Sequence, residues 1–122
     1  MKLRFRANNL RLRVNQREVQ SLAAGRALAE HVVFPGDTRL EYTLASAPTG
    51  APKACFTNGS IQVVAPEEQI AGWAHGEEIG LYFDLPADGT TLKVAIEKDL
   101  ECIDGPVGER DPDSFPRTGK NC

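Results

Sequence analysis

Four arginines near the start of the chain stand at alternating positions and are well suited to binding an anion: Arg4, Arg6, Arg11 and Arg13. Apolar residues lie between them, so residues 1–14 predict a two-stranded hairpin with one apolar face and one basic face. Guanidinium groups bind phosphate or carboxylate through paired hydrogen bonds. The pattern therefore predicts an anion site. The plainer alternative is a solvated face that is neutralised by acidic neighbours.

Three acidic residues lie at alternating positions near the end of the last predicted strand: Glu97, Asp99 and Glu101. Carboxylates that project from one side of a strand could hold a hard cation such as Mg²⁺, the one cofactor that the sequence brings into question. Lys98 breaks the apolar alternation here, so solvated acids are the ordinary explanation. If the first and last strands pair, the same carboxylates become partners of the arginines.

Nucleophilic catalysis finds little support in the sequence. The three cysteines, Cys55, Cys102 and Cys122, are an odd number without C-x-x-C spacing, which favours free thiols over disulfides or a zinc site. His31 and His75 stand outside any motif that would pair them with a nucleophile. Phosphate-binding loops and dinucleotide fingerprints are also missing. The sequence therefore leans away from an enzyme.

The elements that must position these residues follow one another in a simple order. After the first hairpin, Asn15 and Glu18 form a capping box, and Gly25 suits the end of a short helix. A second hairpin turns at residues 35–37. Residues 53–65 then predict a hairpin around an Asn-Gly turn. A second short helix follows, with Pro66 at its first position. The last hairpin turns at residues 86–89.

The order strand, strand, helix, strand, strand thus occurs twice, in residues 1–46 and 53–98. Apolar residues of the two units match at an offset of 51, as in Leu12 with Val63 and Leu28 with Ile79, and at an offset of 52 near the end. We interpret this as an internal repeat, although any two such units share some hydrophobic spacing. The fold class is β-rich α+β, with eight short antiparallel strands closed into a barrel or packed as two sheets, plus two short helices.

A single globular domain is expected over residues 1–103, and residues 104–122 read as a polar, flexible tail in which Phe115 is one of two residues to bury. No apolar run reaches the length of a signal sequence or a membrane span, which favours a cytoplasmic protein without membrane contact. Residues 1–26 carry a charge of +6 and the remainder −9, for a net charge of −3. The two parts could neutralise each other, and the acidic total disfavours nucleic acid as a partner.

Two resemblances follow from these motifs. In topology alone, the doubled unit resembles the triphosphate tunnel (CYTH-like) barrels, but the acidic E-x-E-x-K of their first strand is replaced here by L-R-F-R. The opening LRFRANNLRLRVNQREVQSLAAG, the closing VAIEKDLEC and the Asp-Pro-Asp-Ser-Phe-Pro of the tail resemble a family of small bacterial proteins known as a domain of unknown function. That resemblance implies a single-domain bacterial cytoplasmic protein and brings no activity with it.

Three functions remain open at this point. The first is a non-enzymatic module whose basic face binds a phosphorylated small molecule or an acidic protein surface. The second is a metal-dependent phosphohydrolase that uses the three acids with the arginines as phosphate clamps. The third is a structural protein that associates with itself through an exposed strand face, and the oligomeric state is left open.

Overall fold

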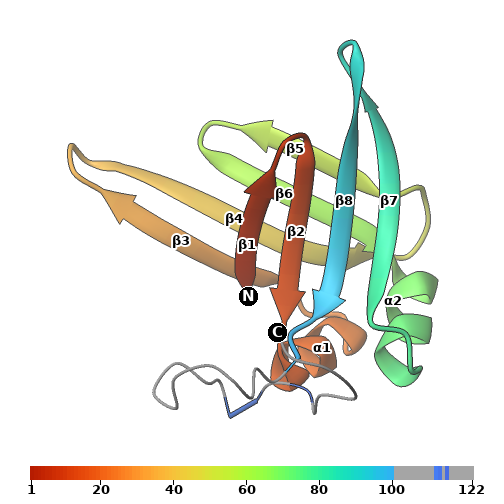
Figure 1. Ribbon diagram of the computed structural model, residues 1–122. Helices are drawn as coiled ribbons and strands as arrows, with labels where there is room; N and C mark the ends of the chain where they lie inside the picture. Colours follow the sequence, from red (N-terminus) through yellow and green to blue (C-terminus); the bar gives the residue numbers. More distant parts are fainter. Residues whose placement is uncertain (101–111, 114, 116–122) are drawn as a thin grey trace.

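The computed structural model describes residues 1–100, 112, 113 and 115, and places eight strands and two helices among them (Figure 1). In chain order the elements are β1 (Lys2–Arg6), β2 (Asn9–Val14), α1 (Gln16–Ala23), β3 (Leu28–Phe34), β4 (Thr38–Ala47), β5 (Lys53–Thr57), β6 (Ser60–Pro66), α2 (Glu67–His75), β7 (Gly80–Ala87) and β8 (Thr90–Lys98). The predicted order of strands and helices is therefore confirmed.

The strands form two separate four-stranded sheets that face each other. Sheet A has the order β1-β2-β8-β7 and sheet B the order β3-β4-β6-β5. The helices lie together at one end of the molecule, and the strands of sheet B run across those of sheet A (Figure 1). The two-sheet alternative of the predicted α+β fold is thus confirmed, and the barrel alternative is not formed.

The expectation that all strands are antiparallel is wrong at the centre of each sheet. β2 pairs with β8, and β4 with β6, in parallel. Each helix carries the chain from one sheet to the other, so every sheet combines one hairpin from each half of the chain. The inner strands of the two hairpins both run toward the helices (Figure 1), which makes their contact parallel.

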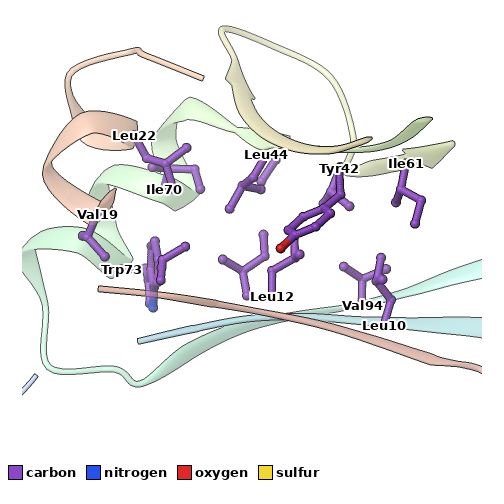
Figure 2. Packing of buried hydrophobic residues seen from close by; sticks show 14 residues of the cluster. Leu10, Leu12, Val19, Leu22, Tyr42, Leu44, Ile61, Ile70, Trp73 and Val94 are labelled. Atoms are coloured by element: carbon purple, nitrogen blue, oxygen red, sulfur yellow. The ribbon is translucent and has the colours of Figure 1, made fainter. Parts of the chain in front are cut away.

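Alternation of apolar and polar residues builds the core between the sheets. Among the residues that the structure describes, fourteen apolar ones are buried in this core, with the helices covering one end of the cluster (Figure 2). They are Leu10, Leu12, Val14, Val19, Leu22, Tyr42, Leu44, Ile61, Val63, Ala65, Ile70, Trp73, Val94 and Ile96. Trp73 is the largest of them, and its indole N–H donates to the carbonyl oxygen of Ile79 at 2.9 Å, which satisfies its one polar group inside the core.

The fourteen core residues fall into seven pairs, one member from each half of the chain. Offsets of 51 residues, as for Leu12 and Val63, and of 52 residues, as for Leu44 and Ile96, relate all of them. The match of Leu28 with Ile79 is wrong, because Leu28 lies opposite Leu44 whereas Leu81 lies opposite Ile96. Leu28 therefore corresponds to Leu81 at an offset of 53, because Leu81 follows Trp73 by eight residues whereas Leu28 follows Leu22 by six. The turn from β3 to β4 has three residues and the turn from β7 to β8 has two, which brings the offset to 52 in β4 and β8.

The helix ends follow the local sequence closely. The capping box of α1 is present, because the side chain of Asn15 accepts from the N–H of Glu18 and Glu18 accepts from the N–H of Asn15, both at 3.0 Å. Pro66 precedes α2 as its N-cap rather than occupying the first helical position that was predicted. Its extended backbone also pairs in β6, and one residue therefore ends a strand and begins a helix.

Most of the predicted tail, residues 104–122, and the predicted end of the domain at residue 103 lie outside the described residues. Phe115 is described and packs against the core. Its N–H donates to the carbonyl oxygen of Asp99 at 2.8 Å, and it forms a bridge with Leu100. The ring of Phe115 also lies 5.4 Å from the Nζ atom of Lys98, a buried cation at the end of β8.

Candidate functional site

The outer face of sheet A carries the predicted arginines in three rows across its four strands. The pairing registers define the rows from β1 through β2 and β8 to β7: Lys2, Arg13, Glu97 and Gly80; Arg4, Arg11, Ala95 and Tyr82; Arg6, Asn9, Lys93 and Asp84. Six of these side chains are basic and two are acidic. The four predicted arginines thus share one solvent-facing surface, and Arg4 lies directly opposite Arg11.

Glu97 neutralises the half of this surface that lies toward β8. Its Oε1 atom is 3.2 Å from Nε of Arg11 and 3.8 Å from Nε of Arg13. The hydroxyl group of Tyr82 donates to the other carboxylate oxygen at 2.7 Å. Burial raises the pKa of Tyr82 above its ordinary value, and the hydrogen bond and negative charge of Glu97 raise it further, whereas Arg11 lowers it.

Gly80 leaves the space in which the contact between Tyr82 and Glu97 forms. A Cβ atom at Gly80 would lie 2.7 Å from the hydroxyl oxygen of Tyr82 and 2.9 Å from Cγ of Glu97. The ring of Tyr82 therefore covers the glycine and holds Glu97 beside the arginines. Tyr82 was not among the predicted site residues, because its contact with Glu97 depends on how β7 pairs with β8.

Asp99 does not join Glu97 in one cluster. It lies beyond the end of β8, is 6% exposed, and its Oδ2 atom is 2.8 Å from Nζ of Lys2. Its backbone N–H donates to the carbonyl oxygen of Val14. Glu101, the third predicted metal ligand, lies outside the described residues. Within the described part of the chain, no group of three or more His, Cys, Asp or Glu side chains could hold a metal ion.

Arg4 and Arg6 differ from the other cations of this surface. Over residues 1–100, 112, 113 and 115, no acidic group forms an ion pair with either of them, and both are exposed. Together with Asn9 and Arg11 they line a hollow of about 150 Å³. Its lining offers guanidinium and amide N–H donors, the groups that bind the oxygen atoms of a phosphate or carboxylate.

The turn between β1 and β2 fixes the end of this hairpin against β8. Asn8 donates from its side chain to the carbonyl oxygen of Thr91 at 2.9 Å, and the N–H of Lys93 donates to the carbonyl oxygen of Asn8 at 3.1 Å. Ala7, with a φ of 50°, adopts the left-handed conformation that side chains disfavour. The turn thus comprises Ala7 and Asn8, and Asn9 begins β2, where it reaches the hollow.

The cysteines and histidines are placed apart from this surface as far as the structure describes them. Cys55 is exposed on β5 of sheet B, opposite Gln62, and Cys102 and Cys122 lie outside the described residues. His31 lies on β3 and His75 ends α2, on different elements. The structure therefore brings no cysteine–histidine pair to the arginines in the described region.

Comparison with protein families identifies the chain. A family of unknown function (DUF7009) matches residues 1–119, and the protein belongs to that family. Neither the curated proteins nor the solved structures contain a match. Among the described helices, none has the length and apolar character needed to cross a membrane.

Proposed function

We propose that this member of a family without assigned activity is a small bacterial cytoplasmic binding module, whose basic strand face holds a phosphate-bearing ligand. The ligand would lie over the hollow lined by Arg4, Arg6, Asn9 and Arg11. The observation that carries the proposal is the unequal neutralisation of the arginines. Arg11 and Arg13 have Glu97 beside them, whereas no described acidic group pairs with Arg4 or Arg6.

The equivalent hairpin of the second half supports this proposal. β5 and β6 pair in the same register as β1 and β2, with Cys55 opposite Gln62 where Arg4 lies opposite Arg11. The two hairpins bury equivalent apolar residues on their inner faces. The shared architecture therefore does not require arginines on the outer face. Like charges directly opposite each other weaken a strand pair, so an anion over the first hairpin would relieve a repulsion that the second hairpin lacks.

The chemistry of the hollow favours phosphate over a single carboxylate. Arginine binds two oxygen atoms of one group through a planar fork, and three guanidinium groups can share the charge of a phosphate dianion. The ligand must also tolerate Glu97 at the border of the hollow, because its carboxylate is held by Arg11 and Tyr82. A ligand centred on Arg4 and Arg6 avoids that negative charge.

Titration calorimetry with inorganic phosphate, tripolyphosphate and nucleotides tests the proposal at low and at physiological salt. The double variant R4A/R6A should lose at least tenfold in affinity. A matched control removes two exposed cations from sheet B, in R39A/K53A, and should change affinity by less than twofold. The proposal is wrong if no member of the panel binds with salt dependence, or if both double variants weaken binding equally.

The same samples separate binding from hydrolysis. A binding module leaves tripolyphosphate intact in the presence of Mg²⁺. Phosphate release that requires Mg²⁺ and disappears in E97A would instead support the metal-dependent phosphohydrolase with Glu97 as one of its metal ligands.

A further inference from the structure

β3 is an edge strand of sheet B with an unusually exposed, apolar sequence. Six of its seven residues, Leu28–Phe34, are exposed. Val33 is 74% exposed, Phe34 48% and Val32 45%. β4 covers one side of the strand, and no strand in the described part of the chain pairs with the other side. The hairpin of β3 and β4 projects away from the rest of the molecule (Figure 1).

The other three edge strands carry features that prevent contact with a further strand. β1 presents the cations Lys2, Arg4 and Arg6, and β7 contains Asp84 and Pro86. β5 has only five residues and begins with a lysine. Short strands, lysines, prolines and outward charges are the means by which proteins protect sheet edges. β3 has seven residues and contains no lysine, arginine or proline.

We propose that β3 pairs with β3 of a second copy of this chain, antiparallel and around a two-fold axis. The free N–H and C=O groups of an edge strand require a strand as their partner. Self-pairing covers both unprotected edges in one closed contact, whereas pairing β3 with a different edge leaves one β3 open unless the copies close into a ring. The product is a dimer in which two copies of sheet B form one eight-stranded sheet.

The charges of β3 fit a second copy of itself. Its outer-face residues Ala29, His31 and Val33 carry no formal charge when the histidine is neutral. Its one acidic side chain, Glu30, is engaged within its own chain, since Oε2 lies 3.5 Å from the α-amino nitrogen of Met1 and accepts from the hydroxyl of Tyr42 at 3.0 Å. Two β3 strands therefore meet without the repulsion that two β1 strands would suffer.

The size of the contact predicts weak association. A ladder of seven residues is only about 23 Å long. A contact along one strand of this length buries less surface than the interface of a permanent dimer usually does. We therefore expect a monomer–dimer equilibrium that shifts with concentration. Light scattering after size exclusion, with reductant present because the chain has three cysteines, should show the mass rising from 13.3 kDa toward twice that value as concentration increases.

Val33→Lys places a cation on the exposed outer face of β3 and should keep the mass at that of a monomer over the same concentrations. Cys55→Lys makes the matched change on β5, the opposite edge of the same sheet, and should leave the dimer intact. Ala29→Lys provides a second disruption in case Val33→Lys fails to fold. Hydrogen exchange should show the amides of β3 gaining protection as concentration rises.

A protein that stays monomeric to millimolar concentration overturns the proposal, and so does a dimer that survives both lysine substitutions in β3. Protection of the β3 amides that is independent of concentration also overturns it, because another segment of the same chain would then cover the edge. These results leave the anion site untouched, since that site lies on the outer face of sheet A.

Discussion

Replacing Glu97 by glutamine should lower stability and raise anion affinity at the same time. Glu97 is 14% exposed and is the one carboxylate that contacts the arginines of the binding surface in the described residues. A hydrogen bond to a charged group contributes about 1.5–3 kcal/mol, and glutamine keeps part of it. The ion pairs add little, because the arginine side chains are about 40% exposed. We expect unfolding in urea to show a loss of about 1–2 kcal/mol.

The effect on affinity has the opposite sign because a negative charge leaves the border of the site. The pairing registers place Glu97 about 12 Å from the centre of the four lining residues at the usual strand spacings. For two unit charges at that distance, Coulomb's law gives roughly 0.3–1.4 kcal/mol between effective dielectric constants of about 80 and 20. That range corresponds to a gain of about two- to tenfold in affinity for tripolyphosphate at low salt, and salt should reduce it. Calorimetric titration of the wild type and Glu97→Gln measures the difference.

Asp84→Asn is the matched control, since Asp84 is the other carboxylate of the same surface. It lies about as far from the centre of the hollow as Glu97 does, but in the described residues it forms no ion pair with a lining arginine. Its replacement removes the same charge without releasing Arg11, so affinity should rise less than in Glu97→Gln. If Glu97→Gln instead weakens tripolyphosphate binding, or leaves it unchanged while stability falls, the hollow beside Arg11 is not the binding site.

Three further predictions concern the framework. Burial, reinforced by Glu30, raises the pKa of Tyr42 to about 12. The neutral phenol therefore contributes stability that is complete below pH 10 and is lost as pH rises through 12, and Tyr42→Phe should remove this loss. Because the chain has two tyrosines, ultraviolet titration of the Tyr82→Phe variant should report the ionisation of Tyr42 alone. Lys98→Ala should lower the free energy of unfolding in urea by about 2 kcal/mol, because Nζ of Lys98 donates to the carbonyl oxygen of Gly76 at 2.9 Å. Lys98→Met should lower it less, because methionine keeps most of the apolar part of the lysine side chain. Gly59→Ala should lower stability by at least about 1 kcal/mol, because φ is +74° and a Cβ atom would lie 3.0 Å from the carbonyl oxygen of Arg39. Thermal unfolding of the wild type and the variant measures this difference.

Local patterns in the sequence predicted the local structure well. Alternation placed the arginines on one face, and the capping box of Asn15 and Glu18 located the start of α1. Alternation leaves two registers of the first hairpin open, with Arg4 opposite either Arg11 or Arg13, because both have the same parity. The structure pairs Arg4 with Arg11. The Asn58-Gly59 turn was predicted from residue type, and both residues have the positive φ values that such a turn requires.

Contacts between distant segments could not be predicted in the same way. The assignment of hairpins to sheets depends on how each helix redirects the chain, and hydrophobic spacing is identical whether β2 meets β8 in parallel or antiparallel. Tyr82 reaches Glu97 because Gly80 lacks a side chain, a relation between neighbouring strands that one strand alone does not reveal. The absence of a carboxylate beside Arg4 among the described residues likewise depends on how the fold arranges distant segments.

The two proposals assign different roles to the two sheets, and charge explains the division. The cations of β1 make the outer face of sheet A attractive to anions and also protect that edge from pairing with another strand. Removing Arg4 and Arg6 should therefore have a second effect, because the edge of β1 loses its protection while its apolar Phe5 stays 59% exposed. β3 lacks such charges, and Val33→Lys would give it one. The loss of anion affinity in R4A/R6A and the loss of the β3 contact in Val33→Lys should therefore be independent, and the combined variant should show both. Association that reappears in the combined variant would come from the edge of β1.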